Sequence, residues 1–128
     1  VNSDVNETGV FDVSEGSVPE NWAALDIGPK TQKKFSEIVE KSGTAFLGGP
    51  MGKFEDEKFA EGSRAILKAM QNLKKDSSGI AIIAGGDTID VARRYSNLDD
   101  YSHISLAGGA TLDFLAGKEL PALKALTE

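Results

Sequence analysis

One pattern recurs three times along the chain: a short apolar stretch, a pair of glycines, and then residues with helical spacing. The three copies begin near residues 44, 80 and 103, and no sequence repeat underlies them. The clearest copy opens with Ile80–Ala84, a continuous apolar run typical of a parallel strand that is buried on both faces. Strands that alternate with helices predict an α/β fold, a Rossmann-like parallel sheet flanked by helices.

Hydrophobic spacing gives approximate boundaries for each element. The predicted strands are Thr44–Leu47, Ile80–Ala84 and His103–Leu106, with two weaker candidates at Val1–Asn6 and Thr8–Val13. The predicted helices are Pro29–Ser42, Arg64–Leu73, a short helix that ends near Tyr95, and Ala110–Ala116, with a helical turn inside Leu120–Leu126. Loops are expected at Lys74–Gly79 and Ser96–Asp100.

Local signals indicate where the helices begin and end. Pro29 is expected to start the first helix, because proline at that position loses no needed N–H, and Gly43 is expected to follow its C-terminus. Ser63 is the expected N-cap of the second helix. The residues expected in the core from their spacing are Phe35, Ile38, Ile66, Leu67, Met70 and Leu115.

Seven of the fourteen glycines fall in the three loops that leave the carboxyl ends of the predicted strands. Ligands of open α/β sheets bind at this edge. Glycine lets the backbone approach a ligand closely, and the helix that follows presents unpaired N–H groups to an anion such as phosphate. Any one of these loops is equally well explained as a plain strand-to-helix turn, but three at one edge favour a ligand site.

The second glycine loop also carries polar side chains. Asp87 follows Gly85-Gly86 at a helix start, where a carboxylate together with phosphate oxygens suits Mg²⁺. Thr88 can donate its hydroxyl to a phosphate. Both residues can instead serve as helix N-caps. The glycine context favours the ligand interpretation for Asp87 and leaves the two interpretations of Thr88 balanced.

Composition and known motifs exclude several classes of protein. Twenty acidic against fourteen basic residues give a net charge of −6, which argues against nucleic acid or an anionic membrane as a partner. The chain has no cysteine, so disulfides, thiolate metal sites and a cysteine nucleophile are excluded. The apolar runs are too short to span a bilayer. The glycine loops match neither the P-loop G-x-x-x-x-G-K-[ST] nor the dinucleotide motif G-x-G-x-x-G.

Four segments of the chain resemble phosphoglycerate kinases and follow the order found in that family. They are Leu25–Thr31 (LDIGPKT), Gly49–Glu55 (GPMGKFE), Gly85–Thr88 (GGDT) and His103–Leu115 (HISLAGGATLDFL). The family has two Rossmann-like lobes. The resemblance implies that residues 1–128 are the later part of the C-terminal, nucleotide-binding lobe, with the N-terminal lobe and the first part of the C-terminal lobe outside this chain.

The resemblance also implies an activity. The family transfers a phosphoryl group between 1,3-bisphosphoglycerate and MgADP, or in reverse from MgATP to 3-phosphoglycerate, in glycolysis. Its members are expected to be cytoplasmic monomers that bind phosphoglycerate through the N-terminal lobe. A lysine of the catalytic site and the adenine slot come from parts of the family sequence that precede this chain, so the 128-residue chain alone is expected to be inactive.

Positions that match the family's motifs take over its expected roles. The residues that the resemblance assigns to the nucleotide are Gly49, Pro50, Glu55, Gly85, Gly86, Asp87 and Thr88. Among these, Glu55 is expected to bind the ribose hydroxyls, and Asp87 is expected to ligate Mg²⁺. Gly108 and Gly109 are expected to present backbone N–H groups to the phosphoryl group in transfer, a reaction whose catalysis consists mainly of positioning and charge stabilisation.

Several positions depart from the family pattern, among them Leu47 in place of a tryptophan and Leu106 in place of a threonine. Gly48 stands where the family has an asparagine that faces the nucleotide, and Ala107 stands where it has a glycine. A Cβ at Ala107 makes a positive φ costly, so a distorted loop and weaker nucleotide contact are expected consequences. These departures keep open the alternative of a stand-alone or decayed nucleotide- or phosphate-binding module without catalysis.

Three further polar residues have simpler interpretations. His103, the single histidine, is expected to be structural, because phosphoryl transfer needs no general base of this type. Asp26 is expected to fix a loop, and Lys53 is expected to be solvated. The acidic run at residues 55–57 is explained by its favourable position at a helix start, so Glu55 stands out only through the resemblance.

Overall fold

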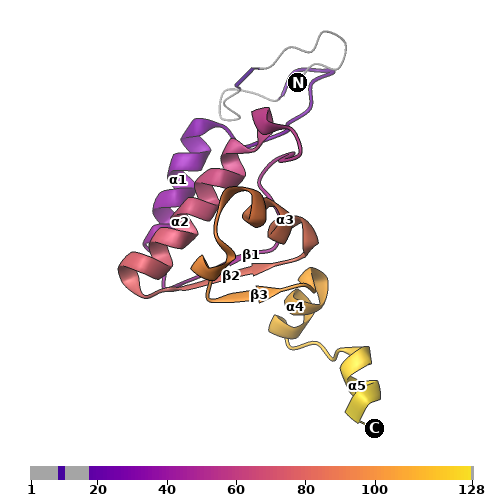
Figure 1. The fold of residues 1–128 in the computed structure, drawn as a ribbon. Helices are drawn as coiled ribbons and strands as arrows, with labels where there is room; N and C mark the ends of the chain where they lie inside the picture. Colours follow the sequence, from indigo (N-terminus) through magenta and orange to yellow (C-terminus); the bar gives the residue numbers. More distant parts are fainter. Residues whose placement is uncertain (1–8, 11–17, 128) are drawn as a thin grey trace.

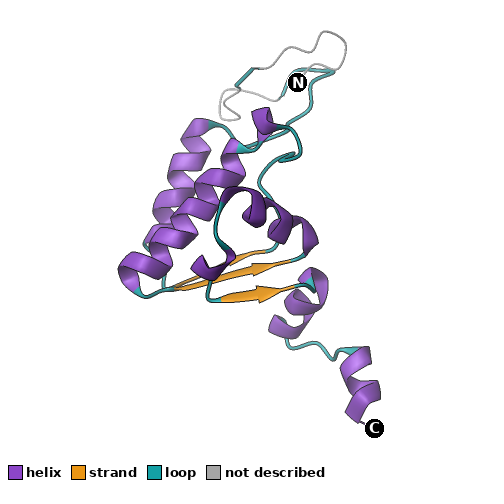
Figure 2. Cartoon of the chain, in the orientation of Figure 1, coloured by secondary structure: helices purple, strands orange, loops and turns teal. Residues whose placement is uncertain are grey.

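Three parallel strands form a single sheet in a computed structural model that describes residues 9–10 and 18–127. The strands are β1 (Thr44–Leu47), β2 (Ile80–Ala84) and β3 (His103–Ser105), and they lie in chain order across the sheet (Figure 1). Helices connect them, as Figure 2 shows. The predicted α/β class with a parallel sheet is therefore confirmed. The candidate strands at 1–6 and 8–13 fall almost wholly outside the described residues.

The helices follow the strands in the expected alternation. In chain order they are α1 (Pro29–Glu40), α2 (Glu61–Ser77), α3 (Gly86–Tyr95), α4 (Gly108–Leu115) and α5 (Pro121–Thr127). Two short 3-10 helices, η1 (Glu57–Phe59) and η2 (Leu98–Asp100), lie in the connections before α2 and before β3. In Figure 1, α1 and α2 lie side by side, whereas α4 and α5 extend away from the other helices.

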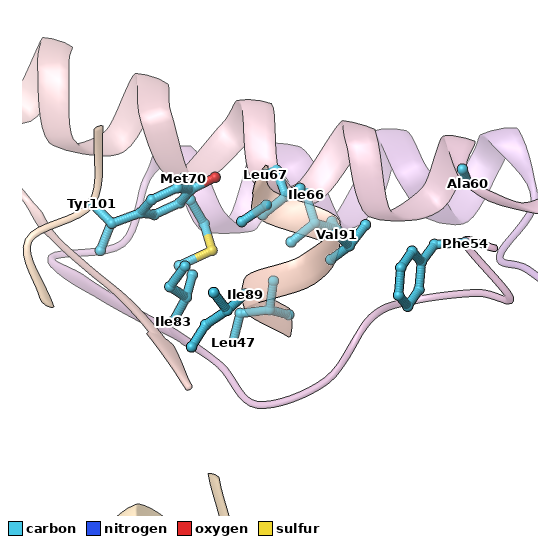
Figure 3. Close-up of a cluster of buried hydrophobic side chains, with 12 residues drawn as sticks. Leu47, Phe54, Ala60, Ile66, Leu67, Met70, Ile83, Ile89, Val91 and Tyr101 are labelled. Atoms are coloured by element: carbon cyan, nitrogen blue, oxygen red, sulfur yellow. The ribbon is translucent and has the colours of Figure 1, made fainter. Parts of the chain in front are cut away.

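The core lies between the sheet and the helices α2 and α3. Figure 3 shows side chains of α2 meeting those of β1, β2 and α3 there. Apolar residues three and four apart on α2 face the sheet, which is the arrangement expected of an amphipathic helix that covers one layer. The buried cluster comprises Leu47, Phe54, Ala60, Ile66, Leu67, Met70, Ala81, Ile83, Ile89, Val91, Ala92 and Tyr101.

The second face of the sheet is less covered. Successive side chains of a strand point to opposite faces, and Ala81 and Ile83 of β2 are fully buried on the core side. Ile80, on the other face, is 49% exposed. The register aligns Phe46 and His103 with the neighbouring Ile82 of that same face. The second face of the sheet is therefore largely apolar and only partly covered.

The register also places the strand ends. Leu47 at the end of β1 pairs with Ile83, and Ala84 at the end of β2 pairs with Ser105. Because all three strands are parallel, the loops that follow them leave the same edge of the sheet. Those loops contain the three glycine clusters.

Several predicted helix boundaries were wrong. The first helix ends at Glu40, and Lys41 caps it in the right-handed region, so Gly43 does not form a left-handed C-terminal cap. The second helix begins at Glu61, which places Ser63 inside it and makes Ala60 the N-cap. It also continues through most of the expected loop at 74–79 and ends where Ser78 takes a φ of 53°.

The C-terminal elements also differ from their predicted bounds. The third strand stops one residue early, leaving Leu106 81% exposed. The helix after it starts at Gly108 rather than Ala110. The expected helical turn in the tail is a helix, α5.

Half of the expected core is confirmed, and half is wrong. Ile66, Leu67 and Met70 are buried under the sheet. Phe35 and Ile38 are 41% and 58% exposed, because α1 packs against α2 rather than on the sheet. The third residue predicted in error, on α4, is Leu115, which is 62% exposed.

Candidate functional site

The loops after β2 and β3 touch each other through their glycines. Gly85 has a φ of 94°, a backbone conformation that residues with a Cβ rarely adopt. A Cβ added to Gly108 would lie 3.1 Å from Gly85 Cα and 3.5 Å from Gly85 N. The absence of side chains on these two residues therefore lets the two loops meet backbone to backbone.

This contact brings the N-termini of two helices together. The Gly85 N–H donates to Ser105 O at 2.9 Å, so this amide belongs to the sheet edge. Gly86 is the first residue of α3, and Gly108 is the first residue of α4. The first amides of a helix have no intrahelical acceptor and carry the positive end of the helix dipole. Two such ends at one sheet edge can bind one anion between them.

Asp87 is the carboxylate nearest to these amides in the sequence. Gly86 and Asp87 are both exposed in the first turn of α3, beside the point where the two loops meet. The described part of the chain has no cluster of three metal-binding side chains. A single carboxylate completed by phosphate oxygens is an ordinary way to hold Mg²⁺, so the donors present fit a magnesium ion that arrives with a nucleotide.

Thr88 lies below the loop rather than on its surface. The residue is 1% exposed, and its Oγ1 has no hydrogen-bond partner among the described residues. A Cβ on Gly85 would lie 3.8 Å from this oxygen. A buried hydroxyl without a partner is costly, and threonine in a helix occupies two χ1 rotamers. A rotation about χ1 is therefore the movement that would let Thr88 donate to a ligand.

The loop after β1, residues 48–56, reaches the same edge. Gly49 and Pro50 are half-buried in it, whereas Glu55 is exposed. Phe54 anchors the loop, since its ring is 5% exposed in the core and lies under the Arg94 guanidinium of α3 at 5.2 Å. The three predicted loops thus gather at one edge, with Glu55 free to meet solvent or a ligand.

Two residues outside these loops border the 48–56 loop: Ser63 bonds its backbone, and Asp26 lies against Gly52. Asp26 accepts hydrogen bonds from Ile27 N and Gly62 N, each at 2.8 Å, which confirms that it fixes a loop. Ser63 accepts from Met51 N at 3.0 Å. A serine just before an apolar stripe is more typical of an N-cap, so the sequence did not indicate that Ser63 would bond the 48–56 loop.

The departures from the family pattern have modest structural effects. Ala107 is the N-cap of α4 with a φ of −102°, so it does not take the positive φ that would be costly for alanine. Gly48 is exposed, and a Cβ there would lie 3.1 Å from Phe46 Cε1. A larger residue at position 48 would therefore need a small shift of the Phe46 ring.

Two of the remaining polar residues lie at the periphery of the site. His103 is exposed at the start of β3, at the opposite end of the strand from the glycine loop. Lys53 has an exposed side chain, and its N–H donates to Leu25 O at 2.8 Å. Across the described residues, no helix has the length and apolar character needed to cross a bilayer.

Comparison with known proteins identifies relatives of this chain. The family model described as phosphoglycerate kinase matches residues 1–118. A phosphoglycerate kinase of Maridesulfovibrio salexigens is 48% identical over 112 residues, which are 88% of this chain and 28% of that protein. A phosphoglycerate kinase of Candida maltosa is 44% identical over 110 residues, covering 86% of this chain and 26% of that protein.

Solved structures agree with the sequence matches. The structure of phosphoglycerate kinase from Coxiella burnetii aligns with a TM-score of 0.72 and 39% identity, over 84% of this chain and 27% of that one. The crystal structure of the enzyme from Pyrococcus horikoshii aligns with a TM-score of 0.64 and 41% identity, over 80% of this chain and 24% of that one. This chain therefore spans about a quarter of the length of these relatives.

The chain is an α/β protein whose parallel sheet presents two helix N-termini and a carboxylate at its carboxyl edge. The family model covers most of the chain, and the relatives are more than 40% identical to it. The chain belongs to the phosphoglycerate kinase family.

Proposed function

We propose that the chain is the later part of the nucleotide-binding C-terminal lobe of a phosphoglycerate kinase, and that its sheet edge binds ADP or ATP with Mg²⁺. The observation that carries this proposal is the backbone contact between Gly85 and Gly108, where a Cβ built on Gly108 would lie 3.1 Å from Gly85 Cα, because it brings the N-termini of α3 and α4 together. A nucleotide polyphosphate is a small polyanion of the kind that two helix N-termini bind together. The net charge of −6 does not oppose this, because the backbone amides act locally.

The nucleotide would lie along the edge from β1 to β3. The 48–56 loop would hold the nucleoside, with Gly49 and Pro50 beside it and Glu55 accepting hydrogen bonds from the ribose hydroxyls. The phosphates would lie over Gly85 and Gly86, where the first amides of α3 can donate to their oxygens.

Asp87 and Thr88 would complete the phosphate site. The exposed carboxylate of Asp87 would hold Mg²⁺, which when bound offsets the negative charge of the phosphate oxygens. The Thr88 hydroxyl, buried and unpartnered, would turn about χ1 to donate to a phosphate oxygen. Both side chains belong to the first turn of α3, so one rigid helix sets their spacing.

The first amides of α4 would act on the phosphoryl group in transfer. In the forward reaction, a terminal phosphate oxygen of ADP attacks the acyl phosphate of 1,3-bisphosphoglycerate, the bond to the carboxyl oxygen breaks, and ATP and 3-phosphoglycerate result. The N–H groups of Gly108 and Gly109 would donate to the equatorial oxygens as this charge moves. Fixed donors of this kind supply electrostatic stabilisation without reorganisation.

The remainder of a phosphoglycerate kinase would supply what this chain lacks. Its relatives are about three times as long as this chain, and Ile80 leaves apolar surface open on the second face of the sheet. Preceding residues of a longer protein would cover that face, and a separate N-terminal lobe would bind phosphoglycerate. We therefore expect a full-length cytoplasmic monomer in glycolysis to be active and the 128-residue chain to be inactive.

Two assays test the proposal on the 128-residue chain. Calorimetry with ADP in the presence of Mg²⁺ should show saturable binding, and heat that is absent at millimolar nucleotide would contradict it. A coupled assay should show no ATP consumption that depends on 3-phosphoglycerate, and turnover by the purified chain would contradict the expected division of labour between the lobes.

A nucleotide- or phosphate-binding module without catalysis remains the second candidate. Gly48 favours it, because this position lacks the side chain that the family places toward the nucleotide. The relaxed φ of −102° at Ala107 removes one argument for a fully decayed site. A longer protein that binds MgADP but catalyses no transfer with 3-phosphoglycerate would favour the module.

A further inference from the structure

The loop at residues 48–56 is contacted from outside by two side chains, Ser63, which bonds Met51 N, and Asp26, which lies against Gly52. We propose that Asp26 and Ser63 are positioning residues for nucleoside binding: they set the place of the loop that carries Pro50 and Glu55. This inference rests on the proposed nucleotide site. It adds to that site the residues that determine where its nucleoside half lies.

Ser63 holds the loop from α2. The residue lies in the first turn of α2 and is 1% exposed. Its Oγ accepts a hydrogen bond from Met51 N at 3.0 Å. Met51 directly follows Pro50, and α2 is packed into the core. The bond therefore ties the nucleoside side of the loop to a rigid helix.

Asp26 holds the start of α2 and packs against the loop. Its Oδ2 accepts from Gly62 N at 2.8 Å, which satisfies an early amide of α2 and places negative charge at the positive end of the helix. A Cβ on Gly62 would lie 2.1 Å from Asp26 Oδ1, and a Cβ on Gly52 would lie 2.5 Å from the same oxygen. The carboxylate thus occupies space that exists because both neighbours are glycine.

A backbone hydrogen bond beside Asp26 also holds the loop. Lys53 N donates to Leu25 O at 2.8 Å, so the segment that carries Asp26 also binds the loop directly. Met51 and Lys53 are two residues apart and are held from opposite partners, α2 and residues 25–27. Because the amides of Met51 and Lys53 are both fixed, the position of Glu55, two residues after Lys53, depends on these contacts.

The test separates positioning from general stability by using two ligands. Magnesium pyrophosphate carries the phosphates of ADP without the ribose, so it engages the glycine loops but not Glu55. We expect Ser63→Ala and Asp26→Asn to weaken MgADP binding roughly two- to tenfold, the effect of one or two lost hydrogen bonds, and to leave magnesium pyrophosphate binding unchanged. Amide hydrogen exchange at Met51 and Lys53 should become faster in both variants.

Ser96→Ala is the matched control. The Ser96 hydroxyl also makes buried hydrogen bonds, to Ala92 O at 2.7 Å and to the Tyr101 hydroxyl at 2.8 Å, but at the far end of α3. Its loss should lower stability without changing either affinity. If Ser63→Ala does not fold, Asp26→Asn still decides, because its carboxylate is only half-buried.

Three results would overturn the inference: unchanged MgADP affinity in both variants, an equal loss of MgADP and magnesium pyrophosphate binding, or unchanged exchange at Met51. If the wild-type chain binds neither ligand, the proposed nucleotide site fails instead. In that case the inference fails with it as a statement about binding, while the exchange rates still show whether the two side chains hold the loop.

Discussion

Glycines of the same loop have different roles in this protein. Gly108 approaches Gly85 so closely that a Cβ would meet backbone atoms, whereas a Cβ on the adjacent Gly109 would meet nothing within 4 Å. Gly85 additionally has a positive φ. The close approach is thus specific to Gly85 and Gly108, although nothing in the sequence distinguishes them from Gly86 and Gly109.

Gly108→Ala should destabilise the chain, because the new Cβ must push the backbone of Gly85 away. We expect a loss of about 1 kcal/mol, at the low end of the cost of overpacking. Gly109→Ala should instead raise the unfolding free energy by about 0.5 kcal/mol, since alanine favours the helix. Denaturant unfolding of both variants measures the difference. Equal effects of the two substitutions would contradict the described contact.

Asp87→Asn should lower MgADP affinity about tenfold, because the amide cannot offer the charged oxygen that Mg²⁺ prefers. Asp90→Asn on the same helix is the control, since its exposed carboxylate lies 3.7 Å from Arg93 and away from the helix start. Calorimetry with and without Mg²⁺ measures both. A tenfold loss that persists without Mg²⁺ would show that Asp87 acts in another way.

Thr88→Val should separate stability from binding. The substitution removes a buried hydroxyl without a partner and keeps the shape of the side chain, so the unfolding free energy should rise by about 1 kcal/mol. MgADP affinity should fall, because the hydroxyl would donate to a phosphate oxygen when nucleotide is bound. Thermal unfolding and calorimetry report the two effects. A variant that is more stable and binds MgADP as well as the wild type would remove Thr88 from the site.

At the scale of elements, the strands were easier to predict than the helix ends. The segments Thr44–Leu47 and Ile80–Ala84 match β1 and β2 residue for residue, because a run of mainly apolar residues is typical of a parallel strand that packs in a core. The end of α2 was missed because lysines and aspartate are compatible with a helix, and the termination depends on the left-handed backbone of Ser78.

The site was predictable in its location but not in its internal contacts. Glycines after parallel strands indicate the edge from the sequence alone. The bond from Met51 to Ser63 and the space beside Gly52 depend on tertiary packing between residues far apart in the chain. The exposure of Phe35 has the same origin, since its helical spacing gives no sign that α1 packs on another helix.

The junction of η2 and β3 should make stability sensitive to alkaline pH. Burial raises the pKa of the Tyr101 phenol above its ordinary value, the charge of Asp100 adds to this, and the hydrogen bond with Ser96 opposes it. A raised folded-state pKa means that the contribution to stability is complete below about pH 10, the unfolded value, and is lost as the pH rises through the folded value.

Tyr101→Phe should therefore be less stable than the wild type at neutral pH, where it lacks the Ser96 hydrogen bond, by about 1 kcal/mol. Above about pH 10 the difference should shrink, because only the wild type loses stability by ionisation of this phenol. Unfolding midpoints measured from neutral to strongly alkaline pH give both curves. Parallel curves would contradict the assignment.

At the scale of the whole molecule, the sheet has two unlike faces. Helices α2 and α3 lie over one face of the sheet (Figure 1) and form the core with it, whereas Ile80 and Leu106 leave apolar surface exposed elsewhere. Relatives about three times as long have further chain with which to cover such surface. The carboxyl edge is nevertheless complete enough to bring the glycine loops after β2 and β3 into contact, so we expect this chain to bind a nucleotide without catalysing the transfer.

Nuclear magnetic resonance of the isotope-labelled chain during a titration with MgADP tests the central proposal most directly, because it reports binding residue by residue. We expect saturable shifts of the amide signals of Gly86, Gly108 and Gly109 and of the 48–56 loop, with the shifts at Gly86 depending on Mg²⁺. Signals that stay in place at millimolar MgADP, or shifts confined to α1 and α5, would contradict it.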